Sequence, residues 1–103
     1  MKHPIKTYKE FYPFYLSEHS NTINRLLHFV GTSIIFLIII AAIWYHKPAL
    51  LLWIPVVGYG FAWIGHFFFE KNKPATFKYP LWSLKSDFKM FFDILRGKIS
   101  FKS

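Results

Sequence analysis

The sequence predicts an all-α integral membrane protein, a two-span helical hairpin with an amphipathic interfacial helix near each end of the chain. The first observation behind this prediction is that hydrophobic residues make up 53% of the 103 residues and fall in unbroken blocks, as expected of a chain with lipid as its solvent. The second is that one short polar break separates the two longest blocks. The third is that most Lys and Arg residues lie outside this pair of blocks. A chain of this length forms a single small domain, 1–103.

The first predicted helix covers about residues 5–18. Apolar and aromatic side chains recur along it with a helical period and lysines lie opposite, which is the pattern of a helix lying at a membrane interface. Pro13 is the expected site of a kink. Charged residues punctuate the whole segment, unlike a signal peptide, so the later apolar runs are expected to remain in the mature protein. The apolar stripe comprises Ile5, Tyr8, Phe11, Tyr12, Tyr15 and Leu16.

A corner in the chain is predicted at Ser20 and Asn21, because either residue is a good N-cap for a new helix. The corner decides whether His19 and His28 can meet. Nine residues of unbroken helix would turn the chain by about 900° and point the two rings in opposite directions. With a corner between them, both rings can approach one point.

The first membrane span is predicted at about residues 29–45, a run of 17 residues without a charge. As a helix this run is about 26 Å long, slightly short of a hydrocarbon core of about 30 Å. Residues 46–48 form the polar break, and the second span is predicted at about residues 49–69. Four Lys or Arg precede the first span, eight follow the second and only Lys47 lies between them. The positive-inside rule therefore predicts cytosolic termini, in a bacterial inner membrane or the endoplasmic reticulum.

A second interfacial helix is predicted at about residues 83–96, after Pro80. It is too polar to span a membrane, but its apolar residues share one face and its charged residues the other. Gly97 is the expected stop. The apolar face comprises Leu84, Phe88, Phe91, Phe92 and Leu95, and the charged face comprises Lys85, Lys89, Asp93 and Arg96.

Four candidate metal ligands are expected where the two spans meet the cytosolic surface. His28 and His66 lie at similar depth, Glu70 follows His66 by one helical turn, and His19 reaches in from the corner. Imidazoles combined with a carboxylate and open coordination positions suit Fe(II), Mn(II) or Zn(II). The chain contains no cysteine, so thiolate ligation is excluded. Asn24 shares a helical face with His28 and is expected to support the ligands from behind.

Each histidine also has a structural interpretation. An intramembrane His66 can hydrogen-bond across the helix pair, although ionisable residues in spans are functional by default. His28 is about as easily explained by its position at the interface, and His19 alone would be a solvated side chain. His3 and His46 have no partners in this scheme, and His46 faces the opposite side of the membrane.

Three basic residues, Arg25, Lys71 and Lys73, are expected beside the candidate ligands. They are either positive-inside anchors or a cationic rim that binds an anionic head group, and the two roles are compatible. Asp87 lies at the edge of the apolar face of the last helix. There it can cap, pair with a lysine or support a metal ligand, but we do not expect it to be a ligand itself.

These motifs resemble those of a known family, the Mpo-type 2-hydroxy fatty acid dioxygenases. The resemblance implies a membrane enzyme of fatty acid α-oxidation that needs Fe(II) held by histidines. It assigns His19, His28 and His66 as the histidine positions, with Asn24 and Glu70 beside them. Longer fungal members carry extra apolar segments and a further Asp-His between the motifs, which this chain lacks. The matching residues are Phe14-Tyr15, His19-x4-Asn24-x3-His28, and Gly65-His66-x3-Glu70-Lys71 with Pro74-Ala75.

The functional hypothesis is therefore an Fe(II)-dependent dioxygenase that shortens 2-hydroxy fatty acids by one carbon. The histidines, with Glu70 as a further candidate, would hold the iron. The carboxylate and hydroxyl of the substrate would chelate remaining positions and O₂ would take another. Arg25, Lys71 or Lys73 would orient the substrate carboxylate. The acyl tail is expected along Phe67, Phe68 and Phe88.

The alternative is a non-catalytic small membrane protein that binds or organises lipids or serves as a subunit of a complex. A small multidrug transporter is a weaker third hypothesis, because two spans would have to oligomerise. Nucleic acid is not an expected partner, since the charge follows the positive-inside pattern and no recognition motif is present. Two spans enclose little space alone, so a homodimer is compatible with the sequence.

Overall fold

The structure is a computed structural model that describes residues 5–73 and 78–101, and these residues form helices and short connections only. The all-α prediction is therefore confirmed for the described part of the chain. Two helical stretches, Thr22–Trp44 and Pro48–Glu70, are long and apolar enough to cross a membrane by length and composition. The elements in order are α1 (Tyr8–Ser17), α2 (Thr22–Trp44), the 3₁₀-helix η1 (Pro48–Leu52), α3 (Trp53–Ile64), the π-helix η2 (Gly65–Glu70) and α4 (Pro80–Leu95).

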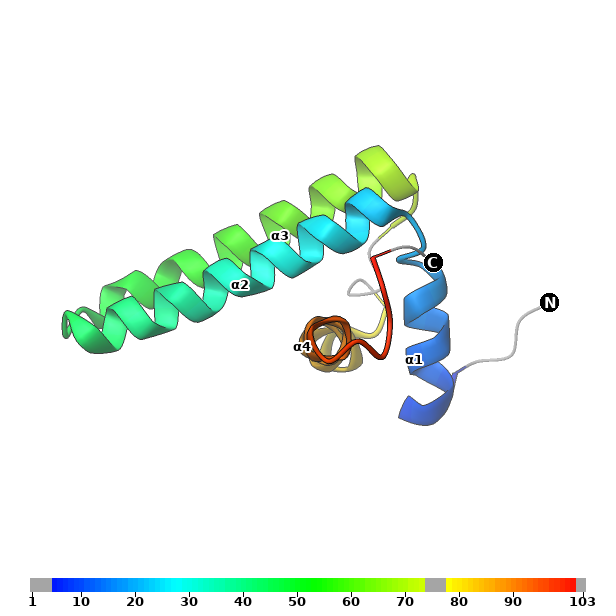
Figure 1. The fold of residues 1–103 in the computed structure, drawn as a ribbon, viewed down its shortest axis with the longest axis horizontal. Helices are drawn as coiled ribbons and strands as arrows, with labels where there is room; N and C mark the ends of the chain where they lie inside the picture. The colour runs from blue at the N-terminus through cyan, green and yellow to red at the C-terminus, as the bar shows by residue number, and fades with distance from the viewer. Residues whose placement is uncertain (1–4, 74–77, 102–103) are drawn as a thin grey trace.

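Helices α2 and α3 lie side by side as a long antiparallel pair that projects away from α1 and α4 (Figure 1). Glycine permits the close approach of the two helices. A Cβ atom added at Gly31 of α2 would stand 3.0 Å from the Cβ of Phe61 on α3, and one added at Gly58 would stand 3.3 Å from Ile35. The pair thus brings the start of α2 and the end of η2 to the same end of the molecule (Figure 1).

The predicted corner is present between α1 and α2. Helix α1 ends at Ser17, and the Asn21 side chain caps α2 by accepting hydrogen bonds from the backbone N–H groups of Ile23 and Asn24, at 2.9 and 3.2 Å. Helix α2 begins seven residues before the predicted span, because this cap starts a helix that continues into the apolar run without a break. Its first two turns therefore carry polar residues.

Helix α4 packs against both α1 and α2. Its Met90 joins Phe11 and Tyr15 of α1 in a buried cluster. On α2, Phe36 contacts three phenylalanines of α4, Phe88, Phe91 and Phe92, with ring centroids 5.4 to 5.9 Å apart. The chain leaves α4 at Gly97, whose φ of +79° suits the predicted glycine stop.

The predicted division of α4 into an apolar and a charged face is wrong at one point. Asp93, expected on the charged face, is only 3% exposed. Its carboxylate accepts hydrogen bonds from the Tyr12 hydroxyl at 2.9 Å, from Lys89 at 3.2 Å and from Arg96 at 3.1 Å. The reason is that α1 supplies a phenolic donor that compensates the burial of Asp93, which the pattern of α4 alone does not reveal.

Candidate metal centre

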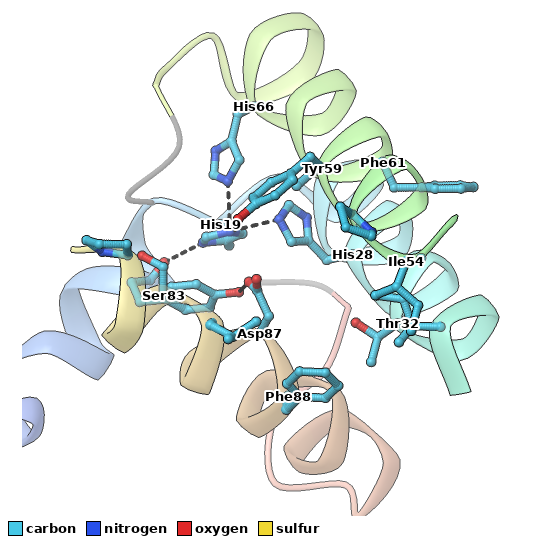
Figure 2. A pocket seen from close by; sticks show the side chains of 18 residues that line it. His19, His28, Thr32, Ile54, Tyr59, Phe61, His66, Ser83, Asp87 and Phe88 are labelled. Carbon is cyan, nitrogen blue, oxygen red and sulfur yellow. Dashed lines mark hydrogen bonds between the residues drawn. The ribbon is translucent and has the colours of Figure 1, made fainter. Parts of the chain in front are cut away.

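Three histidines from three different elements point their Nε2 atoms at one another (Figure 2). His19 lies in the corner after α1, His28 lies in α2 and His66 lies in η2. The Nε2 atom of His19 is 3.2 Å from that of His28 and 2.9 Å from that of His66. All three rings are buried, and their candidate ligand atoms lie within 4.8 Å of one another. The predicted convergence of distant imidazoles is present in the structure.

The outer nitrogen of each ring is held by an oxygen atom. Nδ1 of His19 lies 2.7 Å from the carbonyl oxygen of Tyr15, and Nδ1 of His28 lies 2.9 Å from that of Asn24. A carbonyl oxygen only accepts, so both Nδ1 atoms must carry the proton. In each case the acceptor lies four residues before the histidine, one helical turn away. This spacing is visible in the sequence.

The third ring is fixed by a side chain that the sequence did not single out. Nδ1 of His66 lies 2.7 Å from Oδ1 of Asn72. The orientation of that amide follows from its other end, because Nδ2 of Asn72 donates to the carbonyl oxygen of Glu18 at 3.1 Å. The oxygen therefore faces His66 and Nδ1 must donate to it. The Nε2 atom of each ring is then unprotonated, and the three lone pairs point into the same space.

Such an arrangement is suited to a cation. Facing lone pairs at 2.9 and 3.2 Å repel, and no proton lies between them when the rings are neutral. Protonation of His19 would remove the repulsion, but it is disfavoured. Burial lowers the pKa of His19 well below its usual range, and His28 and His66 lower it further. A metal ion fits instead, since neutral imidazoles with Nδ1 bound to an oxygen are the usual form of metal-ligating histidine. Three ligands leave further coordination positions open.

Gly65 allows His66 to reach the other two rings. A Cβ atom added at Gly65 would stand 1.8 Å from Oδ1 of Asn24 and 3.4 Å from its Cα. The first turn of α2 thus packs directly on the backbone at the start of η2. Asn24 is fully buried there, and its carbonyl oxygen holds His28. Asn24 therefore supports the histidines by its backbone and by its fit against Gly65.

The structure does not bring Glu70 into the histidine group. Its carboxylate accepts hydrogen bonds from the backbone N–H of Asn21 and, at 3.4 Å, from the Ser20 hydroxyl. An N–H group at the start of α2 has no partner within the helix, and the positive end of the helix dipole attracts a carboxylate. Glu70 thus ties η2 to the corner, and its role as a ligand stays a prediction that this geometry does not support.

The predicted cationic rim is divided in the structure. Arg25 is buried, and its guanidinium donates to the carbonyl oxygens of His19, Ser100 and Leu16. It therefore connects the corner, α2 and the C-terminal segment. Lys71 and Lys73 are exposed after η2, and their role toward a substrate stays a prediction. The motif residues Pro74-Ala75 lie outside the described residues.

A cavity of about 210 Å³ opens beside the three histidines. Its polar wall comes from Ser83 and Asp87 of α4, and the Tyr15 hydroxyl donates to the Asp87 carboxylate. Burial raises the pKa of Asp87 to about 7, although the hydrogen bond from Tyr15 lowers it. The cavity continues between apolar side chains of α2, α3 and α4, among them Ile54 and Phe88 (Figure 2). The sequence indicated the position of Asp87 but gave no reason to choose Ser83.

The comparison with protein families gives one match. The family described as 2-hydroxy-palmitic acid dioxygenase Mpo1-like matches residues 5–99. The chain belongs to this family. The match runs from before α1 to beyond α4 and includes all three histidines, so the resemblance in the sequence is confirmed. No curated protein and no solved structure gives a significant match to this Mpo1-like chain.

Proposed function

We propose that this Mpo1-like protein is a membrane-embedded, Fe(II)-dependent dioxygenase that removes one carbon from 2-hydroxy fatty acids. The observation that carries the proposal is the meeting of three Nε2 lone pairs in a buried site, each ring held by an oxygen at Nδ1. The family description supports the reaction class. The cavity beside the rings, polar at one end and apolar along its length, supports an amphiphilic substrate.

The proposed iron would be held by His19, His28 and His66. When bound, Fe(II) supplies open coordination positions and redox chemistry with O₂. The chain itself shields all three rings from bulk solvent, since each is buried. It also fixes the rings before any ligand arrives, through the acceptors on Tyr15 and Asn72.

The proposed reaction balances without an external reductant. A 2-hydroxy acid and one O₂ give an acid shorter by one carbon, CO₂ and water. The bond between the carboxyl carbon and the hydroxylated carbon breaks, and the hydroxylated carbon becomes the new carboxyl group. The hydroxy acid loses four electrons, which is the number that one O₂ takes up. The enzyme therefore needs only the metal, O₂ and the substrate.

We place the helix pair in a lipid bilayer. The apolar side chains of α2 and α3 mostly face outward: Leu37 is 63% exposed and Leu52 is 77% exposed. Only 22% of the most apolar part of Thr22–Trp44 is buried, and only 6% of that of Pro48–Glu70. The core helices of a water-soluble protein are mostly buried. Outward apolar side chains on helices of this length are expected to contact lipid. The positive-inside pattern supports cytosolic termini, and a homodimer stays a prediction.

Metal analysis together with product analysis tests the proposal. The protein purified in detergent should contain about one iron per chain and convert 2-hydroxyhexadecanoic acid to pentadecanoic acid under air. His28→Ala and His66→Ala should lose both the iron and the product. His46→Ala is the matched control, because His46 lies after α2 at the other end of the helix pair.

Two results would contradict the proposal: wild-type protein that binds no transition metal, or histidine variants that retain full turnover. A lipid-organising protein predicts the reverse pattern. In that case replacing Lys71 and Lys73 would abolish function and the histidines would tolerate substitution.

A further inference from the structure

We propose that Ser83 and Asp87 of α4 recognise the 2-hydroxyl group of the substrate and so make the protein select 2-hydroxy acids over unsubstituted fatty acids. The inference rests on the proposed function and adds the residues that determine its specificity. It gives α4 a direct role at the site.

Ser83 is a buried polar group without a partner. The residue is 2% exposed and lines the cavity, and its Oγ makes no hydrogen bond with any residue that the structure describes. An unpaired buried hydroxyl destabilises the fold, so native proteins seldom keep one without a reason. A polar group of a ligand in the cavity would satisfy it.

Asp87 lies one helical turn after Ser83 and lines the same cavity. The Tyr15 hydroxyl donates to its Oδ1 atom. The other carboxyl oxygen is not engaged by Tyr15. This oxygen is an acceptor for the hydroxyl of a ligand, and the Ser83 hydroxyl, which rotates freely, can donate or accept beside it.

Tyr15 joins this polar wall to the histidine group. Its ring is 1% exposed and stacks on His19 with the centroids 3.9 Å apart, and its carbonyl oxygen holds Nδ1 of His19. One residue therefore positions both the candidate ligand and Asp87. In a 2-hydroxy acid the hydroxyl and the carboxyl group lie on adjacent carbons. One can face the polar wall while the other faces the histidines.

An unsubstituted fatty acid would fit the same cavity poorly. Its second carbon carries only hydrogen, so Ser83 and Asp87 would stay unpaired in a space from which the acyl chain has excluded water. Sites built to bind a hydroxyl group reject analogues that lack it, because their own buried polar groups are left unsatisfied. Selectivity would thus come from α4 and turnover from the histidine group.

The test compares binding of 2-hydroxyhexadecanoic acid and hexadecanoic acid to the full-length protein in detergent. Affinity is measured by titration in metal-loaded and metal-free protein, together with the iron content. Ser83→Ala, and Asp87→Leu, which removes both hydrogen-bonding atoms of that side chain, should each reduce the preference for the hydroxy acid about tenfold, the equivalent of one lost hydrogen bond of about 1.4 kcal/mol. The iron content should stay at the wild-type level. Ser83→Cys, which keeps the size of the side chain, replaces Ser83→Ala if the latter does not fold.

Ser86→Ala is the matched control. Ser86 is a fully buried serine of the same helix, but its hydroxyl pairs with that of Tyr8 at 2.9 Å and it does not line the cavity. Ser86→Ala should keep the wild-type preference for the hydroxy acid. If the Ser83 and Asp87 variants also keep this preference, the inference is wrong. The proposed function would still stand in that case, provided that the wild-type protein turns over the hydroxy acid. Wild-type protein with no preference and no turnover would overturn both.

Discussion

His19 and His66 stand 47 residues apart in the chain, yet their Nε2 atoms are 2.9 Å apart and neither has a proton to give the other. The protons sit on the opposite nitrogens, where the Tyr15 carbonyl and the Asn72 amide oxygen accept them. The fold thus brings together groups that repel unless a cation joins them. Stability and metal binding should therefore be coupled in this protein.

Removing the metal should lower the thermal stability. Ligand binding to the folded state alone stabilises by about 2.7 kcal/mol when the ligand is present at 100 times its Kd, which corresponds to roughly 10 to 20 °C in Tm for a domain of this size. We expect Tm to fall on treatment with a chelator and to recover when Fe(II) is added without O₂. Circular dichroism at 222 nm in detergent measures the transition.

The control for this experiment is His28→Ala. Its Tm should not respond to chelator or Fe(II), because one of the three lone pairs is gone. If the Tm of the wild-type protein also changes with neither chelator nor Fe(II), stability and metal binding are not coupled.

Asn72 should control metal affinity without touching the metal. Its Oδ1 fixes the ring of His66, and its Nδ2 is anchored on the Glu18 carbonyl. Loss of such an outer partner typically weakens metal binding 10- to 100-fold, so Asn72→Ala should raise the Kd for Fe(II) or Zn(II) by about that factor. Competition with a chromophoric chelator gives the Kd directly.

Asn72→Asp is the informative partner variant. It keeps an oxygen for the His66 N–H and loses only the donor to Glu18. Its metal affinity should therefore stay much closer to wild type than that of Asn72→Ala. Equal losses in both variants would mean that Asn72 acts by general folding alone.

Gly65→Ala should break the contact between η2 and α2. The new methyl group would meet Oδ1 of Asn24 at 1.8 Å and its Cα at 3.4 Å, so the two segments must separate and His66 must leave the group. We expect loss of bound iron and a destabilisation of about 1 to 3 kcal/mol, the usual cost of overpacking. Metal content and chemical denaturation in mixed micelles measure the two effects.

Gly60→Ala provides the contrast on the same helix pair. A Cβ atom there meets nothing within 4 Å, and alanine suits a helix better than glycine. This variant should keep its iron and its stability. Iron loss in Gly60→Ala as well would show that the helix pair tolerates no substitution, so that the Gly65 result carries no information on its contact with Asn24.

The long-range features of the site could be predicted because they follow from two simple patterns. Two apolar runs joined by a short break bring their outer ends together, which juxtaposes His28 and His66. The N-cap at Asn21 then turns His19 toward them. Neither step requires knowledge of side-chain packing, since helical periodicity and capping decide both.

The finer features could not be predicted because they depend on contacts between elements distant in sequence. Glu70 was expected beside His66 from its spacing, but the unpaired N–H at Asn21 competes for its carboxylate. The sequence predicts that Arg25 is a membrane anchor or part of a cationic rim, but three backbone carbonyl oxygens engage its guanidinium. The sequence gives no signal for Ser83, because its importance lies in a missing hydrogen-bond partner, which only a folded structure reveals.

Asp87 should make the stability depend on pH between about 4 and 7. Burial raises its pKa from 3.8 in the unfolded chain to about 7 in the folded one, so between these values the folded state binds more protons than the unfolded state. Stability then falls as the pH rises through this window. At pH 8 the cost of ionising Asp87 is of the order of 4 kcal/mol, at about 1.4 kcal/mol per unit of pKa.

Asp87→Asn isolates this contribution, since the amide keeps an oxygen for the Tyr15 hydroxyl and does not titrate. The measurement is the free energy of unfolding of metal-free protein at pH 4.5, 6 and 8, in wild type and in Asp87→Asn. Titration of the histidines occurs in both proteins and largely cancels in the difference. The variant should gain stability relative to wild type as the pH rises, by an amount that levels off above pH 7. A difference that is constant with pH would mean that Asp87 is ionised in the folded protein throughout this range, as an ordinary surface carboxylate would be.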